Sequence, residues 1–190
     1  YFSVLQLLGF TILDFDYFKN FVIEKSVDFS GKLSFYNIPL VTFQNPQDFS
    51  SLWIELMKKN EIKGIRILLD LEYKSPDKLQ KFLSNREIQS NLRSLPSENL
   101  DKVIFYFKSI RNETNPLSRV NFGVWSEEGN LVTMTGHFEP FGRGENTLCR
   151  FMAFTHKEQV ILHAIKNEVE KEFLEGITFD NIIPIKKYII

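Results

Sequence analysis

The sequence contains very little cysteine: Cys149 is the only one among 190 residues. A single cysteine cannot form a disulfide bond within the chain, and disulfides are typical of secreted proteins. The cysteine content therefore excludes a fold held together by disulfides. We expect an intracellular protein, either cytoplasmic or nuclear.

The chain also lacks an excess of charge of either sign. Lys and Arg together number 23, Asp and Glu number 24, and the formal net charge is -1. Domains that bind nucleic acid through their overall charge are strongly basic. A nucleic-acid partner is therefore not indicated by charge and would require a local group of basic side chains.

Long apolar runs and short catalytic motifs are missing as well. No run reaches the ~18 residues of a membrane-spanning helix, so we expect no membrane partner. The sequence has no Walker loop, dinucleotide fingerprint or nucleophile elbow. His156 and His163 stand two helical turns apart, whereas zinc-binding histidines on one helix stand about one turn apart. The sequence therefore predicts no metal site and no cofactor.

Apolar residues are plentiful: 43% of the chain is hydrophobic, and 19 residues are Phe. This content is sufficient for one complete core. We predict a single domain over residues 1–190, which could have been excised from a longer protein. Interface cores favour aromatic side chains, so the many Phe residues also favour a protein partner.

Residues 119–126 and 131–138 each alternate apolar and polar side chains, as strands with one buried face do. A three-residue turn at 128–130 would pair Val124 with Met134 and keep the apolar residues on one face. The pattern therefore predicts an antiparallel hairpin at the centre of the sheet.

The second face of this hairpin carries four candidate binding residues, which are Trp125, Thr133, Thr135 and His137. Two interpretations stay open. The face could lie in water, as one face of an antiparallel sheet often does, or it could contact a partner. Arg143, between two glycines, is a further candidate because such a loop can present amides and a guanidinium to an anion.

Further elements follow from caps and periodicity. A capping box at Thr155 and Glu158 predicts a helix over 156–174, and Gly176 is placed to end it in the left-handed conformation. Earlier in the chain, the pattern predicts a hairpin of residues 32–36 and 40–43, and helices over 46–60, 75–84 and 85–93. Residues 97–110 fit a helix or a strand, and we favour the helix.

Asp70, Glu72 and Lys74 project from one face of a strand predicted over 65–74. Acids that hold Mg²⁺ and a lysine that orients water form half of a nuclease site. These three residues are therefore candidate catalytic groups of a Mg-dependent nuclease or phosphohydrolase. Ordinary surface charge at the end of a strand is the other interpretation.

Residues 97–190 are predicted as helix, three strands, helix and strand. This order resembles the core of the PD-(D/E)xK nuclease superfamily. The second strand ends in His137-Phe-Glu139 without the Pro-Asp pair, and the third contains Cys149-Arg-Phe151 in place of Glu-x-Lys. The resemblance therefore implies an inactive relative that acts through its surface.

We predict an α+β domain with an antiparallel-rich sheet and helices packed mainly on one face. The favoured function is a non-catalytic intracellular module that binds a protein partner within a complex. The alternative is the Mg-dependent nuclease or phosphohydrolase.

Overall fold

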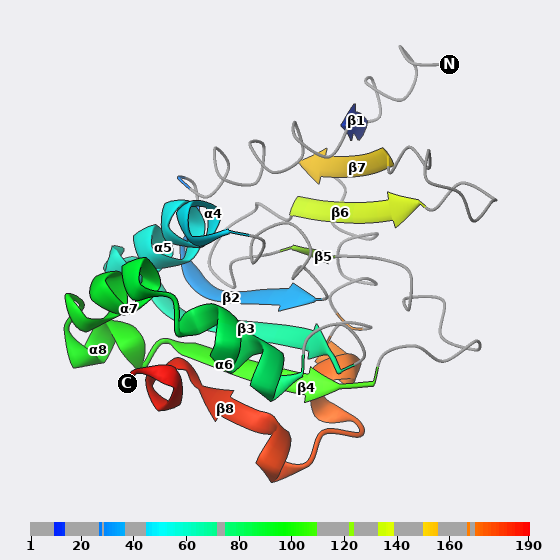
Figure 1. The fold of residues 1–190 in the computed structure, drawn as a ribbon. Coiled ribbons are helices and arrows are strands. Elements are labelled where there is room, and N and C mark those ends of the chain that lie inside the picture. The colour runs from blue at the N-terminus through cyan, green and yellow to red at the C-terminus, as the bar shows by residue number, and fades with distance from the viewer. Residues whose placement is uncertain are drawn as a thin grey trace, which may run out of the picture.

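The structure is a computed structural model that describes residues 10–13, 27, 29–36, 45–71, 75–109, 122–123, 133–138, 150–155, 167 and 170–190. Its strands form two sheets, one with the order β5-β2-β3-β4-β8 and one with the order β1-β7-β6. Strand β5 lies against β6, so the two sheets meet edge to edge (Figure 1). Together with the helices, this arrangement confirms the predicted α+β fold.

Strand β3 (Ile62–Asp70) lies in the middle of the five-stranded sheet, parallel to β2 (Gly31–Tyr36) and to β4 (Val103–Lys108). Two short strands, β5 (Phe122–Gly123) and β8 (Ile182–Pro184), pair antiparallel with β2 and β4. Parallel neighbours need crossover connections, and the helices between these strands lie within those connections.

Strand β7 (Arg150–Thr155) is the middle strand of the smaller sheet, antiparallel to β1 (Phe10–Leu13) and β6 (Thr133–Phe138). The predicted pairing of Val124 with Met134 involves a position outside the described residues and stays a prediction. The predicted hairpin of residues 32–36 with 40–43 is wrong, because Phe35 and Tyr36 pair with β3 on one side and with β5 on the other. The neighbours of β2 in the structure are β3 and β5.

The first helical segment runs through α4 (Pro46–Phe49), the π-helical turn η2 (Ser50–Ile54) and α5 (Glu55–Lys58) without a break. It begins where the sequence predicts, because the side chain of Asn45 accepts a hydrogen bond from the Asp48 amide at 2.8 Å. Pro46 occupies the first turn, where its missing amide hydrogen costs nothing.

Helices α6 (Pro76–Leu83) and α7 (Arg86–Arg93) confirm the two predicted helices and the break between them. Ser75 and Asn85 cap them: the Ser75 hydroxyl accepts from the Lys78 amide at 3.3 Å, and the Asn85 side chain from the Glu87 amide at 2.9 Å. Within the described part of the chain, no helix is both long enough and apolar enough to cross a membrane.

The predicted helix over 97–110 is wrong. Helix α8 (Ser97–Leu100) is one turn long, and β4 follows as a strand with alternating buried and half-buried residues. Val-Ile-Phe-Tyr-Phe consists of β-branched and aromatic residues, which pack well on a pleated surface. Pairing with β3, which sets Ile65 beside Val103, decides the outcome.

The core lies between the five-stranded sheet and the helices α4 to α7, which cover one of its faces (Figure 1). Phe35 of β2 meets Trp53 edge to face with ring centroids 4.5 Å apart, and both side chains are buried in the core. The sheet side of this core consists of Leu33, Phe35, Ile65, Ile67, Leu69, Val103, Phe105 and Phe107.

The last part of the chain covers the second face and one edge of the sheet. Residues 170–174 are helical, and Gly176 has a φ of 69°, as predicted for the residue that ends this helix. The predicted start of that helix lies outside the described residues. Two single turns, η4 (Phe179–Asn181) and η5 (Ile185–Tyr188), flank β8.

Candidate functional site

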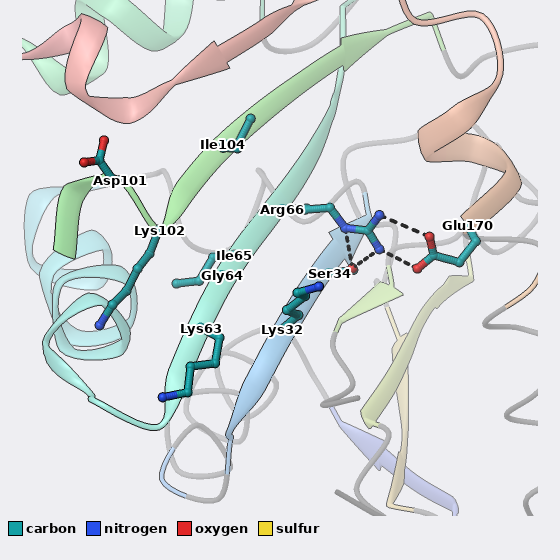
Figure 2. A pocket seen from close by; sticks show the side chains of 10 residues that line it. All are labelled: Lys32, Ser34, Lys63, Gly64, Ile65, Arg66, Asp101, Lys102, Ile104 and Glu170. Atoms are coloured by element: carbon teal, nitrogen blue, oxygen red, sulfur yellow. Dashed lines mark hydrogen bonds and ion pairs between the residues drawn. The ribbon is translucent and has the colours of Figure 1, made fainter. Parts of the chain in front are cut away.

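The second face of the five-stranded sheet contains a partly open hollow of about 370 Å³ near the amino-terminal ends of the parallel strands. It is called the basic hollow below. Its lining residues are Lys32, Ser34, Lys63, Gly64, Ile65, Arg66, Asp101, Lys102, Ile104 and Glu170. In Figure 2, Ser34, Arg66 and Glu170 gather on one side, Lys63 and Lys102 lie on the other, and Lys32 lies between the two groups.

The alternation of side chains along the strands creates this hollow. Leu33 and Ile65 point into the core, so Ser34, Gly64 and Arg66 face the opposite side. Gly64 has no side chain, and a Cβ atom built there would lie 3.9 Å from Cγ of Lys32. A side chain would therefore fit at this position, and it would occupy the floor of the hollow.

Arg66 is held in place on three sides. Its Nε and one terminal nitrogen donate to the Ser34 hydroxyl at 3.0 and 2.6 Å. Both terminal nitrogens bind the Glu170 carboxylate, one at 3.1 Å to Oε2 and the other to Oε1. The Phe173 ring centroid lies 4.5 Å from the guanidinium carbon. Arg66 thus joins the helical residues 170–174 to the sheet.

Lys102 has a partly structural role. Its Nζ donates to the carbonyl oxygens of Met57 at 3.0 Å and Lys59 at 2.9 Å, where α5 ends. Burial lowers the pKa of Lys102, and Lys63 also lowers it, whereas Glu98 and Glu61 raise it. Lys63 lowers this pKa because a like charge nearby disfavours the protonated form of Lys102.

The charge balance of the basic hollow is positive. Four lining residues are cationic and two are acidic. Asp101 is paired with Lys186, which is 52% exposed, and Glu170 is paired with Arg66. Cationic side chains thus outnumber carboxylates among the lining residues, which makes the local potential more positive. An anion is the ligand that this arrangement favours.

The opposite end of the strands holds Asp70, the first residue of the proposed catalytic set. Asp70 is fully buried at the end of β3, beside Lys108 in the register of β3 and β4. Lys108 donates to Glu172 at 2.8 Å. Among the described residues, no group of three or more His, Cys, Asp and Glu side chains is placed to hold a metal ion.

Most of the other predicted site residues lie outside the described residues. These are Glu72, Lys74, Trp125 and Arg143. The backbone of β6 is described, and it sets Thr133, Thr135 and His137 opposite Thr155, Ala153 and Phe151 of β7. These positions belong to the smaller sheet, separate from the sheet that holds the basic hollow. The catalytic set and the binding patch therefore stay predictions.

Sequence reasoning missed the basic hollow. One signal could have indicated it: parallel strands covered on both faces are normally apolar throughout. Lys32 with Ser34, and Gly64 with Arg66, place polar or small residues at alternate positions of two such strands. Parallel pairing of these strands would have brought the four residues onto one face.

Comparison with known proteins supports the fold. No protein-family model and no curated protein matches the chain. Among solved structures, the fold is similar to that of TrmBL2, an archaeal chromatin protein whose structure shows a novel mode of DNA binding, with a TM-score of 0.53 and 9% identity. The match covers 92% of this chain but 59% of that chain, so this chain corresponds to only part of TrmBL2.

Proposed function

We propose that this chain is a non-catalytic module that binds nucleic acid through the phosphate groups at the basic hollow. The observation that carries the proposal is the excess of lysine charge in a concave surface whose two carboxylates are already paired. The likeness of the fold to a DNA-binding chromatin protein supports it.

Lysine binds phosphate as a point charge on a flexible stem, without the planar geometry that arginine imposes. Lys32 and Lys63 lie on neighbouring strands, line the hollow and are exposed. Arg66 is already bound by Glu170 in this state. The proposed contact therefore positions a backbone rather than reading bases, so we expect little sequence preference and a strong dependence on salt.

The experiment measures fluorescence anisotropy of a labelled single-stranded oligonucleotide and its duplex at low salt. Lys32→Gln together with Lys63→Gln should weaken binding about tenfold and reduce the slope of log K against log salt by about two, one for each lost phosphate contact. Lys78→Gln together with Lys81→Gln is the matched control, because helix α6 packs on the other face of the sheet.

Two results would overturn the proposal. One is a wild-type chain that binds neither oligonucleotide at about 50 mM salt, where phosphate contacts are strong. The other is an equal loss of affinity in both double variants, which would indicate a general effect of charge.

A protein partner is a second candidate function, favoured by exposed apolar side chains near the C-terminus. Leu174 and Phe179 are 76% and 89% exposed, on either side of the turn at Gly176. Strongly exposed large apolar side chains five residues apart in the sequence are the feature that favours a protein contact here. Leu174→Ser with Phe179→Ser should abolish a protein complex recovered with the native chain and leave oligonucleotide binding unchanged. Survival of that complex would exclude these residues as its interface.

A further inference from the structure

The Glu170 carboxylate occupies the position at Arg66 that a phosphate of a bound strand would take. We propose that Glu170 is an internal competitor of the nucleic-acid backbone at the basic hollow, an inference that rests on the proposed function. A guanidinium binds carboxylate and phosphate with the same two-pronged geometry. Both oxygens of Glu170 are engaged in this way.

Solvent reaches both side chains of the Arg66–Glu170 pair, so a ligand can approach Arg66. The side chains of Arg66 and Glu170 are 30% and 31% exposed, whereas those of the neighbouring pair Lys108 and Glu172 are 17% and 16% exposed. Both side chains are half-buried, so water solvates them in part when the pair opens. An incoming phosphate, which offers Arg66 the same two-pronged contact, can therefore take the place of Glu170.

The helical residues 170–174 have anchors other than Glu170. Phe173 is 4% exposed and packs edge to face on Tyr106, with ring centroids 5.1 Å apart. Glu172 binds Lys108 at 2.8 Å. These contacts hold the segment on the sheet when Arg66 changes partner, so displacement of Glu170 does not require the helix to leave.

Because of the layout of the hollow, the competition between Glu170 and a ligand for Arg66 depends on the length of the ligand. Lys63 and Lys102 lie on one side of the hollow and Arg66 lies on the other, with Lys32 between them (Figure 2). A single phosphate reaches the lysines without disturbing Glu170. A strand with successive phosphates extends to Arg66 and must displace the carboxylate. The ligand class is therefore a phosphodiester chain rather than an isolated phosphate.

The test compares three glutamate variants that each remove one negative charge from the same segment. Glu170→Gln should bind the labelled single strand roughly fivefold or more tightly, the lower range of a coupling between sites. Glu172→Gln and the exposed Glu175→Gln should stay within about twofold of wild type; Glu175→Gln serves as the control if loss of the Lys108 pair impairs folding. Adding Arg66→Gln to Glu170→Gln should cancel the gain, because the gain acts through the released guanidinium.

Equal gains in all three variants, or a gain that survives Arg66→Gln, would overturn the inference, since either result indicates a general effect of charge. If wild type binds and the Lys32 and Lys63 variant loses affinity, but Glu170→Gln gives no gain, only this inference fails. If neither wild type nor Glu170→Gln binds, the proposed function fails and the inference fails with it.

Discussion

Arg66 and Glu170 form a two-pronged ion pair although 104 positions of sequence separate them. The pair connects the middle strand of the sheet to the helical residues 170–174, on the face opposite the main core. Phe173 lies under the same guanidinium. One contact thus serves the stability of the fold and limits access to the proposed anion site.

The fork of hydrogen bonds made by Arg66 cannot be reproduced by a lysine. Arg66→Lys keeps the charge but loses the planar donors that bind Ser34 and Glu170 together. We expect the free energy of unfolding to fall by about 1–3 kcal/mol, measured by urea denaturation. Lys187→Ala, an exposed control, should change it by less than about 0.5 kcal/mol. An unchanged urea midpoint in Arg66→Lys would contradict the proposed role.

Gln89 ties the C-terminus to the helices. It is 6% exposed, its Nε2 donates to the carbonyl oxygens of Leu83 at 2.8 Å and Tyr188 at 2.9 Å, and its Oε1 accepts from the Ile190 amide at 3.0 Å. Gln89→Met keeps the shape and leaves three backbone groups without that partner. The loss of unfolding free energy should be about 2–4 kcal/mol.

The control for this variant is Gln80→Met on helix α6. Gln80 is half-buried, and its side chain contacts Ser84 of the same helical segment at 3.3 Å. We expect a change within about 0.5 kcal/mol. Similar urea midpoints for the two variants would show that Gln89 does not anchor the C-terminus.

Local signals made much of the fold predictable. Asn45 and Ser75 cap helices because their side chains bond to nearby amides, and Gly176 ends a helix because it can adopt a positive φ. These effects act within a few residues, so the sequence displays them directly. Whether residues 103–108 form a helix or a strand was not predictable in this way. The apolar residues there fit both the helical and the strand period, and pairing with the parallel strand β3 decides between them.

The basic hollow was not predictable for a related reason. Its residues come from β2, β3, β4 with the turn before it, and the helical residues 170–174, so no sequence spacing marks them as a group. The hollow also depends on Gly64, because any larger residue at this position would place its side chain on the floor of the hollow. The sequence predicted a strand over 65–74 that includes Asp70, whereas β3 ends at Asp70, and its neighbour in the register, Lys108, is set by the fold.

Phe173 should contribute more to the docking of residues 170–174 than the ion pairs do. Burial of its ring against Tyr106 and Arg66 removes apolar surface from water. Phe173→Ala should reduce the free energy of unfolding by about 3–5 kcal/mol. The adjacent Leu174→Ala is the matched control, because Leu174 is 76% exposed and should change stability little. Equal effects of the two variants would refute this packing.

Tyr188 makes the stability of the fold depend on alkaline pH. Its side chain is buried, and none of the described residues hydrogen-bonds to its hydroxyl. Burial and, as a smaller cause, the negative charge of Asp77 together raise the pKa of Tyr188 to about 12. The unfolded chain loses this proton near pH 10 and the folded chain near pH 12, so the unfolded state gains stability between these values.

Tyr188→Phe removes both the ionisable group and the unpaired hydroxyl. Below pH 10 the raised pKa contributes no pH dependence, and the variant should be as stable as wild type or up to about 1 kcal/mol more stable, since the lost hydroxyl has no partner among the described residues. At pH 11 the difference in unfolding free energy in favour of the variant should be larger by about 1.4 kcal/mol, because pH 11 is one unit above the pKa of tyrosine in the unfolded chain. Urea denaturation of both proteins at pH 7, 9 and 11 measures this difference, and all other titrating groups are common to both. A stability difference that stays constant from pH 7 to pH 11 would show that Tyr188 titrates equally in the folded and unfolded chains.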